Sequence, residues 1–220
     1  MNRIVFWSVF VTAGLICIAG WTQENGMIPF PLGQLDPEIL NEFYPQIMGE
    51  IEKEFVLQND RRALRSTREY GYSFFKMMNG DFTYCPPPEF LQELGRRVCQ
   101  ALSHPSREFT NIILSYYGEG FHLMPHVDTN PKDHPNKNYY FDEPVYGLIL
   151  EPDSSGHLYF VYDEINTAPS PELPPILSLE EKPGMIFCLQ GDYRKSPYYH
   201  GVSKVLNRRI SITFRTVIQK

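Results

Sequence analysis

The 220-residue sequence has few cysteines and no pattern that would tie them together. Its four cysteines, Cys17, Cys85, Cys99 and Cys188, form no CxxC pair and no Cys/His spacing of the kind that holds structural zinc. Loss of an N-terminal segment that includes Cys17 would leave three, an odd number that gives no disulfide framework. The cysteines therefore indicate small core residues or free thiols, and they leave the redox compartment open.

Internal repeats, low-complexity tracts and an excess of positive charge are also absent. The net charge is −6 and the pI is about 5.5, so nucleic acid would have to be held by a local basic patch. The length suits one well-buried domain, here residues 23–220, and is short for two. A hydrophobic content of 42% with 14 Tyr and 15 Phe favours a β-rich core over a helical bundle.

One uncharged run, residues 4–20, follows a basic start at Arg3 and ends in the small residues Ala19 and Gly20. This layout is typical of a signal peptide, and the run is short for a membrane span. A short signal anchor, a buried first strand or a misassigned start are the alternatives. We expect residues 1–22 to be a signal peptide or short anchor, with any membrane contact confined to 4–20. This favours a secretory, exported or membrane-anchored location over an intracellular one.

Helical patterns precede strand patterns along the chain. One helix is expected to begin at Asp36-Pro37 with a kink at Pro45, and a second to follow Pro86-Pro87-Pro88. From residue 109, short apolar runs alternate with turn residues. The expected strands are Asn111 to Tyr117, Val145 to Leu150, His157 to Tyr162, Pro175 to Leu179, Gly184 to Gln190 and Arg209 to Val217. The pattern predicts an α+β protein, with a helical and substrate-lid region at 23–108 and an antiparallel β core, a sandwich or barrel, at 109–220. Long polar loops at 129–144 and 163–174 are expected to form the rim of a site.

The first candidate for chemistry is His126-Val127-Asp128. In an extended chain, residues i and i+2 project to the same side, so the imidazole and the carboxylate can bind one small ion. His200, between two expected strands, is the best candidate for a third ligand. Two histidines and one carboxylate on one face of an octahedron are the ligand set of non-haem Fe(II) oxygenases. The tripeptide alone is a weak signal, because it arises often by chance.

The last expected strand places Arg209, Ser211, Thr213 and Arg215 on one face. If that face points to water, the strand is simply half exposed. If it lines a barrel, two buried guanidinium groups need anionic partners, because an unpaired buried charge is costly. A small dicarboxylate would satisfy both, since guanidinium groups bind carboxylates with two parallel hydrogen bonds.

Two segments, NIILSYYGEGFHLMPHVD (111–128) and HGVSKVLNRRISITFR (200–215), resemble the catalytic core of AlkB-like dioxygenases. The spacing from Tyr117 to His126 fits that family without a gap, and RxSxTxR resembles its RxNxTxR ending. The segment 68–72 resembles the stretch that leads into the family's substrate lid, so the likeness covers roughly residues 60–217. The short gap from His200 to Arg209 is also similar to that of prolyl-hydroxylase-like enzymes.

The resemblance implies a double-stranded β-helix, or jelly roll, flanked by N-terminal helices, with Fe(II), 2-oxoglutarate and O2 as cofactors and co-substrates and ascorbate as a reductant. It implies that His126, Asp128 and His200 ligate the iron and are the catalytic residues. Arg209 would pair with the distal carboxylate of 2-oxoglutarate, helped by the Tyr117 hydroxyl, and Arg215 would meet the end that chelates iron. Ser115 stands where the family often has Asn, and the serine makes the weaker polar contact of the two. The substrate residues implied are Tyr72, Arg68 and Asn130, although Thr129-Asn130 stands where repair enzymes commonly carry an acidic residue.

The activity implied is hydroxylation or oxidative demethylation, with alkylated nucleic acid as one substrate class. The cluster Arg61, Arg62, Arg65 and Arg68 and its aromatic neighbours support nucleic acid, but a solvated helix face would look the same. The acidic pI, Asn130 and the N-terminal segment speak against it. The alternatives are a protein (prolyl-type) or small-molecule hydroxylase and, in another class, a non-catalytic jelly-roll binding module, which would have no need of an intact HxD…H. Two further histidines compete as ligands, His122 and His134, but neither has a carboxylate two residues later.

Overall fold

The structure is a computed structural model that describes residues 22–23, 26–27, 32–53, 55–59, 63–128, 138–164 and 173–219. Antiparallel strands dominate it, and helices are few. The helical segments are α1 (Pro37–Ile51), α2 (Phe74–Met78), α3 (Glu89–Ala101) and the 3₁₀ turn η1 (Gly191–Arg194).

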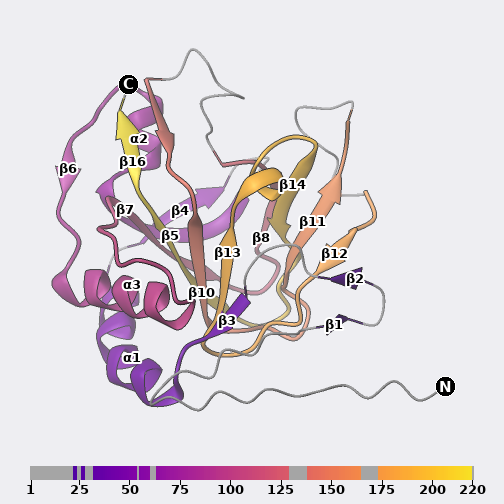
Figure 1. The fold of residues 1–220 in the computed structure, drawn as a ribbon, viewed down its shortest axis with the longest axis horizontal. Coiled ribbons are helices and arrows are strands. Elements are labelled where there is room, and N and C mark those ends of the chain that lie inside the picture. Colours follow the sequence, from indigo (N-terminus) through magenta and orange to yellow (C-terminus); the bar gives the residue numbers. More distant parts are fainter. Residues whose placement is uncertain are drawn as a thin grey trace.

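The strands are β1 (Thr22–Gln23), β2 (Gly26–Met27), β3 (Leu32–Gln34), β4 (Val56–Asn59), β5 (Ala63–Tyr72), β6 (Tyr84–Cys85), β7 (Asn111–Tyr117), β8 (His122–His126), β9 (Tyr139–Phe141), β10 (Val145–Glu151), β11 (Leu158–Tyr162), β12 (Leu177–Ser178), β13 (Met185–Leu189), β14 (Tyr198–Val202), β15 (Arg209–Arg215) and β16 (Val217–Gln219). The main sheet has the order β12-β11-β14-β8-β5-β7-β15-β10-β13-β3, with β4 and β6 added beside β5. Every neighbouring pair in it is antiparallel, and the sheet curls into a half-barrel (Figure 1).

The two layers follow from the alternation of side chains along the central strands. In β15, Ile210, Ile212 and Phe214 belong to a cluster with apolar residues of α1 and α3. The alternate residues, from Arg209 to Arg215, therefore face the interior of the half-barrel. Helices α1 and α3 contact each other on the outer face (Figure 1). The strand is thus covered on both sides, so its polar face does not point to water.

Helix α1 begins where the sequence predicts. The Asp36 side chain accepts a hydrogen bond from the Glu38 N–H at 2.8 Å, and Pro37 occupies the first helical position, where no N–H is needed. Pro45 lies inside the helix, as expected. No helix in the described part of the chain is long and apolar enough to cross a membrane, and residues 1–21 lie outside the description.

Strand β5 is the main departure from the expected division of the chain. It lies in the region expected to be helical or to form a lid, yet residues 66–71 pair with β7 and Ala63 and Leu64 pair with β8, near the centre of the main sheet. The sequence pattern does not indicate this strand, because the residues from Arg65 to Glu69 are polar. The inner face of the strand is polar, and only part of its outer face is apolar. Part of the expected loop 129–144 is also a strand: β9 pairs with β16. The residues 129–137 and 165–172 of the two expected loops lie outside the described parts.

Candidate metal centre

Two neighbouring strands bring the predicted metal ligands together. His126 at the end of β8 is directly opposite His200 of β14, and their ring centroids are 4.4 Å apart. Asp128 follows β8 by two residues. One ligand atom from each of the three side chains lies within 4.8 Å of the others. The HxD spacing and the distant third histidine therefore converge, and in the described residues this is the one such group of three or more potential ligands.

The histidines are held in a form suited to binding a cation. The Nδ1 of His126 lies 3.1 Å from the Met124 carbonyl oxygen, which can only accept, so Nδ1 carries the proton and Nε2 keeps its lone pair. Desolvation lowers the pKa of His126, and desolvation together with the neighbouring His126 lowers the pKa of His200 to about 3. Both rings are therefore neutral at physiological pH, as ligation requires.

Asp128 is buried, with 4% of its surface exposed, and its Oδ1 lies 2.9 Å from Nη2 of Arg215. Burial alone would raise the pKa of this carboxyl, but the charge of the neighbouring Arg215 outweighs burial and holds the pKa well below the ordinary value. The Oδ2 of Asp128 and the Nδ1 of His200 have no hydrogen-bond partner among the described residues. Buried polar atoms of this kind are seldom left unmatched, so the geometry and the donor set fit a two-histidine, one-carboxylate iron site.

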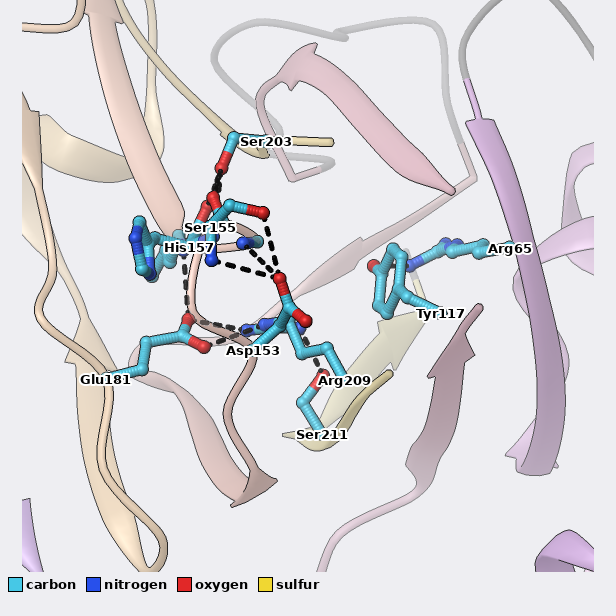
Figure 2. A network of polar contacts seen from close by, with 11 residues as sticks. Arg65, Tyr117, Asp153, Ser155, His157, Glu181, Ser203, Arg209 and Ser211 are labelled. Atoms are coloured by element: carbon cyan, nitrogen blue, oxygen red, sulfur yellow. Dashed lines mark hydrogen bonds and ion pairs between the residues drawn. The ribbon is translucent and has the colours of Figure 1, made fainter. Parts of the chain in front are cut away.

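Arg209 is the first residue of β15 and Arg215 is the last. Both lie on the same face of the strand, but their surroundings differ. Arg215 lies against the ligand Asp128 and over the ring of Phe141, with 4.6 Å from its Cζ to the ring centroid. Arg209 is paired with Glu181: its Nε and Nη2 donate to the two carboxylate oxygens at 2.8 and 2.7 Å, and its Nη1 donates to Ser211 (Figure 2). The carboxylate that the two-arginine face was predicted to need is, at Arg209, a residue of the chain itself.

The other predicted co-substrate residues line the same interior. Tyr117 is directly opposite Arg209 across β7 and β15, and the Arg209 Cζ lies 5.3 Å from the centroid of its ring. The Tyr117 hydroxyl accepts a hydrogen bond from Arg65 instead, at 3.4 Å. Ser115 is buried opposite Ser211, on the inner face of β7. Tyr117 and Ser115 therefore lie on the face of the sheet where the family resemblance predicts the co-substrate.

The predicted substrate residues are scattered. Tyr72 ends β5 and packs against Tyr84 with a ring separation of 4.9 Å. Arg68 projects to the opposite face from Arg65 and forms an ion pair with Glu50 of α1 at 3.3 Å, so its placement gives no support to a substrate contact. Asn130, Arg61 and Arg62 lie outside the described residues.

Two residues near the site were not found from the sequence. Arg194 is fully buried and donates hydrogen bonds to the backbone carbonyls of Phe141 and Asp142, and its charge helps to lower the pKa values of Asp128 and His200. Glu181 lies in a Glu-Glu-Lys stretch that reads as a solvated turn. No periodicity marks either residue, because both lie outside the strands and are buried by distant parts of the chain.

No protein-family model matches this chain, and no curated protein matches its sequence. Solved structures do share its fold. They include OsALKBH1, with 16% identity and a TM-score of 0.54 over 85% of this chain and 97% of that one. A prolyl hydroxylase from Trichoplax adhaerens, in complex with a hypoxia inducible factor oxygen degradation domain peptide fragment, has 13% identity and a TM-score of 0.53 over 84% and 82%. A prolyl-4-hydroxylase from Pseudomonas putida has 13% identity and a TM-score of 0.50 over 85% and 92%.

Identities this low show a shared fold. The chain therefore has the jelly-roll fold found in AlkB homologues and prolyl hydroxylases, and the resemblance seen in the sequence is confirmed at the level of the fold.

Proposed function

We propose that this chain is an Fe(II)- and 2-oxoglutarate-dependent dioxygenase that hydroxylates or oxidatively demethylates its substrate. The convergence of His126, Asp128 and His200 in the interior of a jelly roll carries the proposal. A jelly-roll binding module without activity has no use for three potential metal ligands side by side. Here both histidines are desolvated, and Asp128 Oδ2 and His200 Nδ1 have no hydrogen-bond partner among the described residues. With Fe(II), 2-oxoglutarate and O2 bound, the site would supply oxidative decarboxylation to succinate and CO2, coupled to oxidation of a substrate C–H bond.

The residues of the chain would hold and orient these groups. His126 and His200 would each offer one ring nitrogen, and Asp128 one carboxylate oxygen, because these atoms lie within 4.8 Å of one another and can bind the same ion. Arg215 fixes the Asp128 carboxylate through Oδ1 and leaves Oδ2 for the metal. Met124 sets the tautomer of His126 through its carbonyl oxygen.

The proposal is tested on the purified chain with Fe(II), 2-oxoglutarate and ascorbate, with succinate as the product measured. We expect slow uncoupled turnover without substrate and, under anaerobic conditions, a metal-to-ligand charge-transfer band. His126→Ala should abolish both. His122→Ala removes an imidazole from the same strand that is outside the triad, and it should retain both. A wild-type chain with neither succinate production nor a charge-transfer band would contradict the enzyme proposal and favour the binding module.

The substrate class follows less directly from the site. A row of aromatic rings leads from His200 to the surface: Phe160 lies 6.0 Å from His200, Tyr193 5.7 Å from Phe160, and Tyr198 stacks on Tyr193 at 4.5 Å. Tyr162, 41% exposed, continues the row at 5.2 Å from Tyr198. Exposed rings beside an oxidising centre can stack on unpaired bases or on apolar peptide side chains.

Alkylated nucleic acid and protein are the two substrate classes that this row of rings favours, and a small molecule is the third alternative within the proposal. The separation of Arg65 from Arg68 across β5 removes part of the basic cluster that favoured nucleic acid. We propose that the two are distinguished by binding to single-stranded oligonucleotides at several salt concentrations. An affinity that falls steeply with salt favours nucleic acid, because phosphate contacts release counterions. Formaldehyde release from methylated oligonucleotides would then establish demethylation, whereas hydroxylation of peptides would establish a protein substrate.

A further inference from the structure

Arg209, the residue that the family resemblance assigns to the co-substrate, already binds a carboxylate. Each of its three guanidinium nitrogens donates a hydrogen bond, two of them to Glu181 and the third to Ser211. The side chains of Arg209 and Glu181 are 2% and 1% exposed. Glu181 is fixed further by the N–H of Leu158, which donates to its Oε1 at 2.9 Å. The pair is therefore a closed ion pair inside the fold (Figure 2).

An incoming carboxylate would have to displace Glu181 and leave its charge buried without a partner. Removal of one partner from a buried ion pair costs on the order of 10²- to 10³-fold in an equilibrium constant. A second carboxylate, Asp153, also faces Arg209, and together with Glu181 it overcomes the effect of burial and raises the pKa of Arg209. Two negative charges thus surround one positive charge, and this end of the half-barrel disfavours a further anion.

A different arginine approaches Tyr117 from the other side. Arg65 of β5 donates from Nη1 to the Tyr117 hydroxyl at 3.4 Å (Figure 2). Its Nε donates to the side-chain oxygen of Gln58 at 2.6 Å. Both partners are neutral. Among the arginines of the described residues, Arg65 alone forms no ion pair with a carboxylate. A half-buried guanidinium without an anionic partner favours the binding of an anion, because its charge is only partly hydrated.

Arg65 also lies on the side of the sheet that carries the metal ligands. Its strand pairs with β8, the strand of His126, through Ala63 opposite Leu123 and Leu64 opposite His122. Its guanidinium therefore lies on the interior face that it shares with Tyr117, beside the strand that carries His126.

We propose that Arg65 and the Tyr117 hydroxyl bind the distal carboxylate of the 2-oxo acid, and that Arg209 and Glu181 form a structural ion pair. The inference rests on the proposed function, since it requires a 2-oxo acid at the metal. The Tyr117 hydroxyl accepts from Arg65 and still has its own proton to donate to a carboxylate, so the two side chains make one site.

The experiment compares two co-substrates that differ only in the distal carboxylate, 2-oxoglutarate and 2-oxopentanoate. Their dissociation constants are measured anaerobically with Fe(II) from the charge-transfer absorption. Arg65→Gln should weaken 2-oxoglutarate about 10- to 100-fold, because it removes a charge-assisted hydrogen bond, and it should leave 2-oxopentanoate unchanged. Arg65→Lys, which keeps the charge, should recover part of the loss. Arg208→Gln, an exposed arginine next to Arg209 in sequence, serves as the control and should bind both acids as the wild type does.

Glu181→Gln separates the two arginines. If Arg65 is the receptor, the ratio of the two dissociation constants stays at its wild-type value in this variant. If Arg209 is the receptor, release from Glu181 tightens 2-oxoglutarate alone, which would overturn the inference. An unchanged preference for 2-oxoglutarate in Arg65→Gln would overturn it as well, and that variant does not disturb a buried ion pair. Absence of a charge-transfer band in the wild type with either acid would instead overturn the proposed function, and this inference with it.

Discussion

Gly147 of β10 is directly opposite Phe187 of β13, and the aromatic ring lies over the glycine. A Cβ at position 147 would be 1.8 Å from Cζ of Phe187, well inside any tolerable contact. We therefore expect Gly147→Ala to lower the free energy of unfolding by about 1–3 kcal/mol, the usual cost of overpacking a core. Urea unfolding followed by circular dichroism measures the change.

A double-mutant cycle shows whether the ring causes the loss. In a Phe187→Leu background the ring is absent, so the added methyl group of Gly147→Ala should cost much less. An equal cost of Gly147→Ala in both backgrounds would mean that the glycine is needed for its backbone conformation instead of for the space it leaves.

Single residues were predictable from sequence where two signals coincided. His126 and Asp128 are two apart in an extended chain, and Arg215 shares a face with Arg209, so periodicity predicted each pair. The resemblance to AlkB-like dioxygenases implied that the two pairs belong to one site, and the contact between Asp128 and Arg215 joins them. Glu181 carries no such signal, because it lies 28 residues from Arg209, in the connection between β12 and β13. The sequence therefore predicted that Arg209 needs a carboxylate and could not show that the chain supplies it.

At the scale of elements, a single carboxylate joins two turns. Asp153 in the β10–β11 turn accepts backbone hydrogen bonds from Ser155 and Gly156 of its own turn and from Leu206 and Asn207 of the β14–β15 turn. Burial raises the pKa of this carboxyl, but the four N–H donors outweigh burial and hold the pKa well below its ordinary value of 3.8. The ionised form is thus part of what fixes the start of β15, the strand of Arg209.

We expect Asp153→Asn to lower the free energy of unfolding by about 2 kcal/mol at neutral pH, because the backbone donors lose a charged acceptor. A carboxyl whose pKa is depressed by folding contributes fully above its unfolded pKa, and the contribution is lost as the pH falls through 3.8 toward the folded pKa. The difference between wild type and Asp153→Asn, measured by urea unfolding from pH 7 to pH 3, should therefore shrink below about pH 4.

The exposed Asp192→Asn serves as the control, and it should leave the stability within about 0.5 kcal/mol at each pH. A stability difference for Asp153→Asn that stays constant down to pH 3 would show that shape, and not charge, holds the two turns together.

Most strands of the β core were predictable because a strand buried on one face alternates or reads as a short apolar run. The expected strand Asn111 to Tyr117 has the bounds of β7, β10 is one residue longer than expected, and β13 is one residue shorter than expected at each end. Strand β5 was missed for a physical reason. Arg65, Thr67 and Glu69 form its inner face, so the usual apolar face is replaced by the polar wall of a site.

At the scale of the whole molecule, the main sheet separates two kinds of interior. Helices α1 and α3 cover an apolar outer layer that includes Cys99 of α3 and Cys188 of β13. The inner side carries the candidate metal ligands on β8 and β14. Each layer buries one face of the same strands, so neither can open fully without exposing the sheet. We infer that both layers unfold as one cooperative unit.

Thiol labelling tests this cooperativity in single-cysteine variants. Cys85 is exposed and should react at once, whereas burial raises the pKa of Cys99 and raises that of Cys188 to about 12. If the protein opens only globally, Cys99 and Cys188 should react more slowly than Cys85 by a factor on the order of 10³ or greater. Their rates should also depend on urea in the same way. Mn(II) binds thiols only weakly. It should slow the labelling of both buried cysteines further, because a metal held by the inner triad stabilises the same unit. Rapid, urea-independent labelling of Cys99 would instead mean that the helices detach from the sheet on their own, and Mn(II) would then leave its rate unchanged.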